Sequence, residues 1–430
     1  MNNKSNTILK AEALLKPLAI PHVPQDSEVE ALIDQWLHAI ATDSQLFCRE
    51  ELASADNLKK EVIACLASEG VFTDRLDFFN QVFGGLELKP SENGSFKFID
   101  LFAGIGGMRL GFQQNGGTCV FSSEFDKFAQ GTYKLNHGEL PLGDITKINE
   151  EDIPEHDVLL AGFPCQPFSY SGLCEGFEDK TRGTLFFDVL RILESKRPKV
   201  ALLENVKGFK SHDKGETMFI ALKALDEAGY VPFWTILNSF DYGVPQFRER
   251  WFCVAMRKDL ASNFEFPSSE GRNTTLRDIV DLEESGKAYQ ITDFEKERIE
   301  YHFSRSSLEE RVKHDSSKYA PHTKKGKHGV FSFQKADGAL RFHVGDVAKT
   351  QIQEAFYACL DTYAPTIIAN RVPKLWDIGR KLTVHESLLL QGFPSSFKFE
   401  TSNAQSYKQL GNSVTVSVID RLAKKIKEYL

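Results

Sequence analysis

The sequence lacks the cysteine patterns that a disulfide-stapled or zinc-binding domain requires. It has seven cysteines, an odd number, scattered without a CxxC pair. It also lacks an uninterrupted apolar run long enough to cross a membrane, and residues 1–5 show no apolar core of a secretory signal. We therefore expect a cytoplasmic protein with no membrane association and no bound metal ion.

Acidic residues outnumber basic ones overall, but basic residues are concentrated in one stretch. The net charge of −8 by itself argues against a nucleic-acid partner. Residues 301–350, however, hold ten Lys or Arg against five Asp or Glu, and five of the eleven histidines. Residues 322–328, at the centre of this stretch, suit contacts to phosphate groups, although a solvated surface loop explains the same composition. The asymmetry predicts a basic module attached to an acidic core.

The composition is that of a soluble globular protein with two or three domains: 430 residues, 41% hydrophobic and 26% charged. Residues 1–95 predict a helical extension. Apolar spacing indicates helices over residues 27–40, 58–66 and 73–83, and residues 90–95 form a linker by composition. We find no catalytic constellation in this extension.

From residue 96 onward, strands and helices alternate. Apolar runs predict strands over residues 96–102, 118–123, 157–161, 200–204, 230–237 and 251–256. Helical patterns cover residues 108–115, 185–195 and 218–228. This alternation predicts an α/β fold with a doubly wound, mostly parallel sheet in residues 96–257.

The alternation stops after this region and returns near the end of the chain. Residues 258–375 contain the basic stretch, and we expect them to form a smaller domain. Helices predicted at residues 382–391 and 414–429 indicate that residues 376–430 complete the α/β domain.

Cys165 stands on a proline-flanked loop that directly follows the apolar run of residues 158–161. Pro164 has a fixed φ and no N–H to donate, so the chain leaves the sheet at this point. In open α/β sheets, ligands bind beyond the carboxyl ends of the strands. A thiol in that position is a candidate nucleophile; the alternative is a buried structural cysteine.

A glycine-rich turn, residues 102–107, lies between the first predicted strand and its helix. Glycines allow the backbone to approach a ligand closely, and the N-terminus of a helix favours anionic groups. As a dinucleotide fingerprint the turn is incomplete, because Arg109 occupies the position of the third glycine. This substitution weakens the case for NAD.

Three further residues complete an adenosine-binding pattern. Glu124 lies twenty residues after Gly104, at the end of the second strand, where an acidic residue suits the two ribose hydroxyls. Phe125 offers a ring to stack on adenine. Asp144, which we expect at the end of a short third strand, offers an acceptor for the exocyclic amine. Because no pyrophosphate clamp is present, S-adenosylmethionine fits this pattern better than NAD; a plain turn with surface acids is the alternative.

Polar residues at two further strand ends suit a ring-binding site. Glu204 ends the predicted strand 200–204, and parallel strand ends meet at one crevice, so we expect it near Cys165. A carboxyl group in such a cleft is hard to ionise and can donate a proton to a ring nitrogen. Gln246, Arg248 and Arg250 share one face by period-two alternation. Arginine suits bidentate recognition; structural salt bridges are the alternative.

These segments together resemble the cytosine-C5 DNA methyltransferase family of bacterial restriction–modification systems. The resemblance does not extend to residues 1–95. The motifs that carry it occur in the family's order: Phe98-Ile99-Asp100-Leu101-Phe102-Ala103-Gly104-Ile105-Gly106-Gly107, Gly162-Phe163-Pro164-Cys165-Gln166-Pro167-Phe168-Ser169, Glu204-Asn205-Val206, Gln246-Phe247-Arg248-Glu249-Arg250, Arg380-Lys381-Leu382-Thr383, Gln391-Gly392-Phe393-Pro394 and Gly411-Asn412-Ser413-Val414.

The resemblance implies the fold of S-adenosylmethionine-dependent methyltransferases and a covalent mechanism. In it, Cys165 adds to C6 of a cytosine, Glu204 holds N3 and the exocyclic amine, and Arg248 holds O2. The addition makes C5 nucleophilic enough to accept a methyl group from S-adenosylmethionine. The target base has to leave the duplex first, because C6 is inaccessible while the base is stacked.

The resemblance also implies three sets of site residues. The catalytic set is Cys165, Glu204, Arg248 and Arg250. The cofactor-binding set is Phe102, Ala103, Gly104, Gly106, Gly107, Glu124, Phe125, Asp144, Ile145, Pro164, Leu185 and Asn412. The DNA-binding set is Gln166, Ser169, Ser171, Arg182 and Gln246, mostly in a segment that resembles the family's mobile catalytic loop. Residues 258–375 are implied to be a small, mostly β target-recognition domain with loops in the major groove.

The implied partner is duplex DNA, with protection against a cognate restriction endonuclease, and we expect a monomer. A tRNA cytosine-C5 methyltransferase shares the same chemistry and stays open as the alternative. The zinc signature of cytosine deaminases, H-x-E with P-C-x-x-C, is absent from the sequence. A catalytically inactive DNA-binding relative is disfavoured because Cys165, Glu204 and Arg248 are all present.

Overall fold

The structure is a computed structural model that describes residues 6–49, 52–164, 185–260, 263–293, 296, 312–314, 328–334, 340–346, 352–369 and 372–430. For residues 52–54, 312–314, 328–334, 340–346 and 352–357 it describes the backbone alone. No helix in the described residues is long and apolar enough to cross a membrane.

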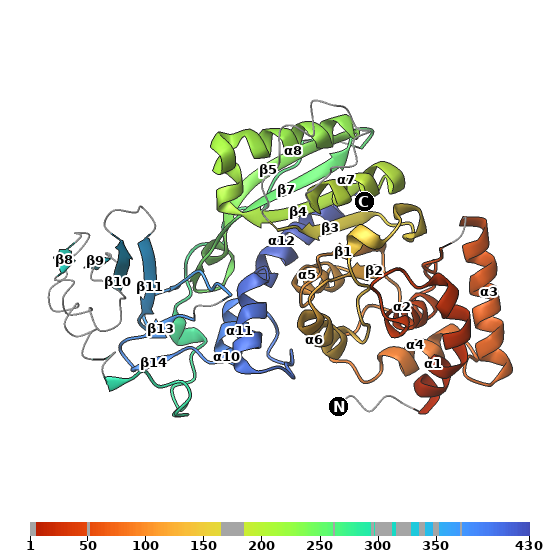
Figure 1. The fold of residues 1–430 in the computed structure, drawn as a ribbon, viewed down its shortest axis with the longest axis horizontal. Coiled ribbons are helices and arrows are strands. Elements are labelled where there is room, and N and C mark those ends of the chain that lie inside the picture. The colour runs from red at the N-terminus through yellow and green to blue at the C-terminus, as the bar shows by residue number, and fades with distance from the viewer. Residues whose placement is uncertain are drawn as a thin grey trace.

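The centre of the molecule is a six-stranded sheet in the order β2-β1-β3-β4-β7-β5 (Figure 1). Its strands are β1 (Phe96–Leu101), β2 (Gly117–Ser123), β3 (Val158–Gly162), β4 (Val200–Val206), β5 (Tyr230–Asn238) and β7 (Glu249–Arg257). β1 to β4 pair in parallel, whereas β7 runs antiparallel to both of its neighbours. The prediction of an α/β fold with a mostly parallel sheet is confirmed.

Helices cover both faces of this sheet because its inner strands are apolar on both sides. On β3, for example, Val158 and Leu160 belong to one core cluster while Leu159 and Ala161 belong to another. The first cluster includes helices α5 (Gly107–Gln114) and α12 (Val416–Lys427). The second includes α7 (Leu185–Lys196) and α8 (Glu216–Glu227). The predicted strands and helices of residues 96–257 exist with ends shifted by a few residues, except for the short strand expected to end at Asp144.

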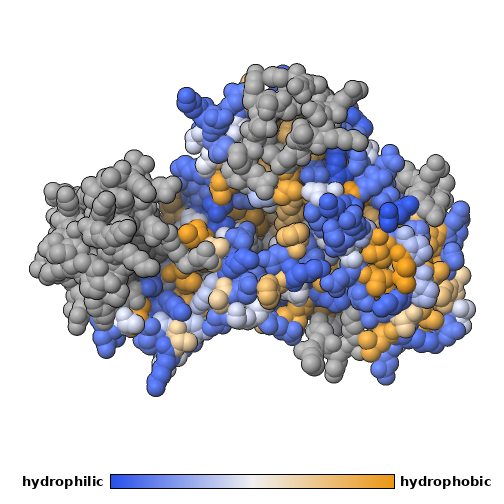
Figure 2. All heavy atoms as spheres, viewed as in Figure 1, coloured by the Kyte–Doolittle hydropathy of each residue, from blue (hydrophilic) through white to orange (hydrophobic). Residues whose placement is uncertain are grey.

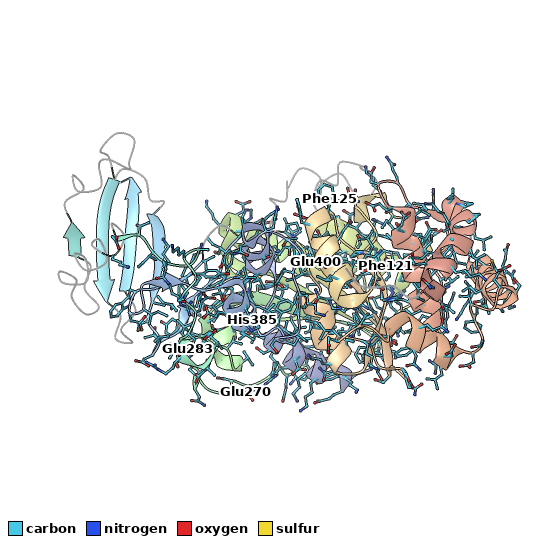
Figure 3. The ribbon with its side chains drawn as sticks, turned by 90° about the horizontal axis from the view of Figure 1, so that it is seen from below. Phe121, Phe125, Glu270, Glu283, His385 and Glu400 are labelled. Carbon is cyan, nitrogen blue, oxygen red and sulfur yellow. The ribbon has the colours of Figure 1, made fainter. Side chains whose placement is uncertain are left out.

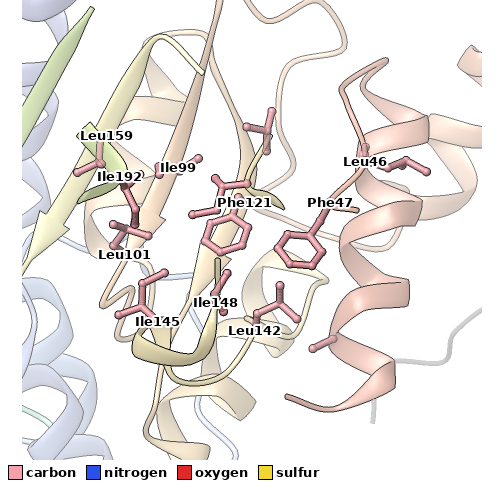
Figure 4. Close-up of a cluster of buried hydrophobic side chains, with 14 of the residues drawn as sticks. Leu46, Phe47, Ile99, Leu101, Phe121, Leu142, Ile145, Ile148, Leu159 and Ile192 are labelled. Carbon is pink, nitrogen blue, oxygen red and sulfur yellow. The ribbon is translucent and has the colours of Figure 1, made fainter. Parts of the chain in front are cut away.

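An N-terminal helical unit, residues 6–49 and 52–89, packs beside β2 (Figure 1). Its helices are α1 (Asn6–Ala19), α2 (Val29–Ala41), α3 (Leu52–Ser68) and α4 (Arg75–Phe83). The last three were predicted; α1, which contains Pro17, was not. The unit shares one hydrophobic core with the sheet, where the Phe47 ring stacks on Phe121 with 5.9 Å between centroids (Figure 4). Hydrophobic atoms also gather on its surface, at the right of Figure 2.

A second sheet lies at the other end of the molecule (Figure 1). Its order is β14-β13-β11-β10-β9-β8. Its strands are β8 (Val312–His314), β9 (His328–Gln334), β10 (Leu340–Asp346), β11 (Ile352–Ala358), β13 (Lys374–Leu375) and β14 (Arg380–Lys381). A separate small core lies at its base, around Leu276 and Leu375. The predicted boundary at residue 258 stays a prediction, although Phe264 packs in the core of the main sheet.

The last part of the chain returns to the main sheet. It forms α10 (Val384–Leu390), α11 (Asn403–Asn412) and α12, and the last of these lies against α5. Thr383 and Glu386 form a capping box at the start of α10. The predicted helices at residues 382–391 and 414–429 are confirmed, whereas α11 and α6 (Lys127–His137) were not predicted. Two short strands, β6 (Gln246–Phe247) and β12 (Ala364–Pro365), pair in parallel beside this region.

Candidate active site

A pocket of about 930 Å³ opens beyond the carboxyl ends of β1 to β4. Nine of the twelve predicted cofactor-binding residues line it: Phe102, Gly104, Glu124, Phe125, Asp144, Ile145, Pro164, Leu185 and Asn412. Three of the four predicted catalytic residues line it as well: Glu204, Arg248 and Arg250. The pocket therefore joins two groups of residues that the sequence singled out separately.

The turn after β1 forms the floor of the cofactor end. Phe102 and Gly104 have positive φ values of 54° and 56°, so the chain reverses sharply here. The Gly104 N–H donates to Glu124 Oε2 at 2.7 Å. A Cβ added at Gly104 would meet no atom within 4 Å, so this backbone is open to a ligand.

The Glu124 carboxyl is partly buried and is fixed by backbone donors. Its second oxygen, Oε1, accepts from the Asp126 N–H at 2.7 Å. Burial raises the pKa of Glu124, and the hydrogen bonds from Asp126 and Gly104 oppose that rise. Two fixed donors leave further lone pairs on both oxygens for hydroxyl groups.

Phe125 and Asp144 stand at the rim of the same end. The Phe125 side chain is 76% exposed and lies at the molecular surface (Figure 3). Asp144 Oδ1 accepts from the Thr146 N–H at 3.0 Å. The expectation of a third strand ending at Asp144 is wrong: only one isolated bridge forms, between Ser123 and Leu142, and the chain then turns away from the sheet.

Three predicted cofactor residues, Ala103, Gly106 and Gly107, do not line the pocket. They allow the turn to pack closely against its neighbours. A Cβ on Gly106 would lie 2.1 Å from His137 Nε2, and one on Gly107 would lie 2.9 Å from Ser413 Oγ. These glycines are therefore required by packing behind the pocket wall.

At the other end of the pocket, Glu204 faces a guanidinium group. Arg250 Nε lies 3.1 Å from Glu204 Oε1, and both side chains are largely buried. Burial raises the pKa of Glu204, while Arg250 and then Arg248 oppose that rise. The direction agrees with the expectation of a carboxyl group that is hard to ionise.

The two arginines that the sequence placed on one face both line the pocket but have different partners. Arg248 donates to the backbone carbonyl of Ile367 at 2.8 Å and to those of Gly411 and Ser413. Among the described residues, the Nε of Arg248 has no hydrogen-bond partner. Three backbone carbonyl groups thus accept from the terminal nitrogens of Arg248, and the expectation that this residue holds O2 of the ring stays a prediction. Arg250 lies beside Glu204 in the same pocket.

Gln246 corrects another expectation. It was predicted to contact DNA, but its side chain is fully buried. Its Nε2 donates to the carbonyl of Leu390 at 2.9 Å, and its Oε1 accepts from the Ile367 N–H at 3.0 Å. Gln246 therefore links β6 to distant segments of the chain and does not face a ligand.

Sequence reasoning missed several pocket residues. Asn205 donates from Nδ2 to the Phe163 carbonyl at 3.1 Å and so ties the end of β4 to the end of β3. Lys408, which lines the pocket, pairs with Asp126 at 2.9 Å. Asn205 lies in a motif that the sequence analysis quoted, but Lys408 had no local signal because its partner is far away in the chain.

Five predicted site residues lie outside the described residues: Cys165, Gln166, Ser169, Ser171 and Arg182. Their roles stay predictions. Within the described parts of the chain, no group of three or more His, Cys, Asp or Glu side chains is arranged to hold a metal ion.

Similarity to known proteins identifies the family of this chain. The family model of the C-5 cytosine-specific DNA methylase matches residues 96–428. The chain is 41% identical to the Type II methyltransferase M.DsaV of Dactylococcopsis salina, over 79% of this chain and 88% of that protein. It is 39% identical to M.HhaI of Haemophilus parahaemolyticus, over 79% of this chain and 97% of that protein.

Among solved structures, the S. pombe Dnmt2 methyltransferase matches with a TM-score of 0.54 and 18% identity, over 77% of this chain and 98% of that one. At that identity the likeness shows the fold alone. The match of the family model and the identity to the Type II enzymes show more. The chain therefore belongs to the C-5 cytosine-specific DNA methylase family and is a DNA (cytosine-5-)-methyltransferase of the restriction–modification type.

Proposed function

We propose that this protein transfers a methyl group from S-adenosylmethionine to C5 of a cytosine flipped out of duplex DNA. One observation carries the proposal: a single pocket joins the partly buried carboxyl group of Glu124 to the largely buried pair of Glu204 and Arg250. The first end suits an adenosine group and the second suits a polar ring, so the two substrates would meet between them.

The cofactor end fits the chemistry of adenosine. The Glu124 oxygens have lone pairs for two ribose hydroxyls, Phe125 offers an exposed ring face, and Asp144 offers an acceptor for an amine. This end needs no groups that bind phosphate, because S-adenosylmethionine contains no phosphate group. When bound, S-adenosylmethionine supplies an electrophilic methyl group.

The other end suits the activation of a cytosine ring. Burial raises the pKa of Glu204, which favours the protonated form of its carboxyl group, the form that can donate to N3. Protonation of N3 makes C6 more electrophilic. The guanidinium of Arg250 has N–H groups for O2 beside this carboxyl.

Cys165 supplies the nucleophile in this proposal. Its thiolate forms a bond to C6, and the electron pair of the C5–C6 double bond makes C5 able to take the methyl group. Loss of the C5 proton and departure of the thiolate then restore the aromatic ring and regenerate Cys165. Support for this assignment comes from Pro164, the preceding residue, which lines the pocket.

The reaction requires base flipping, because C6 of a stacked cytosine is out of reach; unpairing costs a few kcal/mol that pocket contacts must offset. Residues 258–375 would choose the target sequence. Protection against a cognate restriction endonuclease, and the monomeric state, stay predictions.

Replacement of the nucleophile tests the proposal. Cys165→Ser should abolish methyl transfer and leave the affinity for S-adenosylmethionine within about twofold, because the serine hydroxyl is a far weaker nucleophile in the same volume. Cys65→Ser, on helix α3 of the N-terminal helical unit, is the matched control and should keep full activity. Substantial transfer by Cys165→Ser, measured with tritiated cofactor and methylatable DNA, would refute the nucleophile assignment.

A further inference from the structure

We propose that Ser27 of the N-terminal helical unit positions the cofactor pocket. The unit would then be a working part of the methyltransferase rather than a separate appendage. The inference rests on the proposed binding of S-adenosylmethionine at Glu124 and Asp144, and it assigns a role to a segment that lies outside the matched residues 96–428.

The loop that carries Asp144 into the pocket is held on one side by β2. The Leu142 N–H donates to the Ser122 carbonyl at 3.0 Å, and the Glu124 N–H donates to the Leu142 carbonyl at 2.9 Å. These bonds connect the two acidic residues of the cofactor end, because Glu124 follows β2 and Asp144 follows the loop. A shift of the loop would therefore change the distance between them.

Gly143, immediately before Asp144, is held from both sides. Its N–H donates to Ser27 Oγ at 3.0 Å, and its carbonyl accepts from Ser123 Oγ at 2.7 Å. Gly143 is buried, so water cannot readily replace either partner. A Cβ at this position would lie 2.3 Å from the Asp26 carbonyl oxygen, so the N-terminal helical unit also blocks movement of the loop in its direction.

Further polar contacts fix the start of the same loop to α2. Asp34 Oδ2 accepts from the Leu140 N–H at 3.0 Å and pairs with Lys134 Nζ at 2.6 Å. Gln35 Nε2 donates to the Ser122 carbonyl at 2.9 Å. Helix α2 therefore contacts both the loop and the strand that flank the cofactor end.

A buried polar network crosses the same interface. His38 Nδ1 lies 2.7 Å from Glu139 Oε2, and Arg109 NH1 lies 2.6 Å from Glu139 Oε1, with every side chain at most 5% exposed. If the unit separated from the sheet, the buried carboxylate of Glu139 would lose its contact with His38, which would be destabilising. The N-terminal helical unit is thus a fixed support against which Ser27 can hold Gly143.

The test is Ser27→Ala in the full-length enzyme. Loss of the acceptor for the Gly143 N–H should weaken the binding of S-adenosylmethionine about tenfold by calorimetry. KM for the cofactor should rise equally, while kcat at saturating cofactor and the affinity for DNA stay unchanged. Ser27→Thr, which keeps the hydroxyl, should behave as the wild type. Glu28→Gln is the matched control, since it breaks only the exposed ion pair with Lys127 across the same interface.

A cofactor affinity of Ser27→Ala within twofold of the wild type would overturn the inference. So would a fall in kcat with unchanged cofactor affinity. If Ser27→Ala does not fold, Gly143→Ala decides, because its Cβ pushes the loop away from Asp26 and should also weaken cofactor binding. Failure of the wild type itself to bind S-adenosylmethionine would instead refute the proposed function, so the two failures are distinguishable.

Discussion

The two ends of the pocket each contain a carboxyl group whose pKa is raised by burial, yet their partners differ. Glu124 accepts hydrogen bonds from the backbone N–H groups of Gly104 and Asp126, whereas Glu204 is paired with the side chain of Arg250. Backbone donors fix an acceptor in place, which suits the binding of the same cofactor in every turnover. A side-chain partner leaves a carboxyl group that can keep or release a proton, which suits catalysis.

The largest expected effect comes from the catalytic end. Glu204→Gln should lower kcat by about 100-fold to 10,000-fold, because the amide cannot transfer a proton to N3. The affinity for S-adenosylmethionine should change by less than about twofold, since Glu204 lies at the far end of the pocket. Single-turnover methylation and calorimetry measure the two quantities.

Glu249→Gln is the control for this variant. It removes a neighbouring carboxylate that pairs with Lys207 at 2.7 Å on the surface, and its kcat should stay at the wild-type value. A wild-type kcat for Glu204→Gln would contradict the claim that the carboxyl group at this end of the pocket acts in catalysis.

A smaller effect is expected at the cofactor end. Glu124→Gln should weaken the binding of S-adenosylmethionine by about 10-fold to 100-fold, because a single amide oxygen cannot accept from both Gly104 and Asp126 and also from a ribose. At saturating cofactor, kcat should fall much less than in Glu204→Gln. Isothermal titration and saturation kinetics compare the two variants. An unchanged dissociation constant would show that Glu124 is a structural residue only.

The smallest effect concerns stability and pH. The pKa of Glu204 is raised above its usual value of 4.5 in the folded protein. The folded state therefore binds more protons than the unfolded chain between that value and the raised pKa. The contribution of this carboxyl group to stability is fully present below its unfolded pKa and is lost as the pH rises through its folded pKa.

Glu204→Gln removes this titration. The free energy of unfolding of the wild type, measured relative to that of Glu204→Gln, should thus decrease as the pH rises above the usual carboxyl pKa of 4.5. Urea denaturation at a series of pH values gives the comparison. An increase as the pH rises would mean that the ion pair with Arg250 outweighs burial and that the carboxyl group is ionised.

Much of the fold and the cofactor end was predictable because the signals are local. Apolar runs predicted β1 to β4, and the twenty-residue spacing of Gly104 and Glu124 assigned both residues to one binding pattern; the structure joins them by a hydrogen bond that was not predicted. Parallel strands bring such residues together at one edge of the sheet, so their order in the chain is enough to place them.

The failures concern contacts between distant segments. Nothing near Gln246 in the sequence shows that Leu390 and Ile367 would enclose it, and nothing near Arg248 shows that three carbonyl groups would occupy its fork. The anchoring of Gly143 by Ser27 spans more than one hundred residues of chain. Tertiary packing determines these contacts, and no local periodicity or motif in the sequence predicts them.

The central claim is that a thiol adds to the cytosine ring, and a trapping experiment tests it most directly. Duplex DNA with 5-fluorocytosine at the target position should form a covalent complex with the protein in the presence of S-adenosylmethionine, because fluorine cannot leave C5 as a proton does. Intact-mass and peptide analysis should locate the bond at Cys165. The absence of any adduct under conditions in which ordinary DNA is methylated, or an adduct at another residue, would contradict the account.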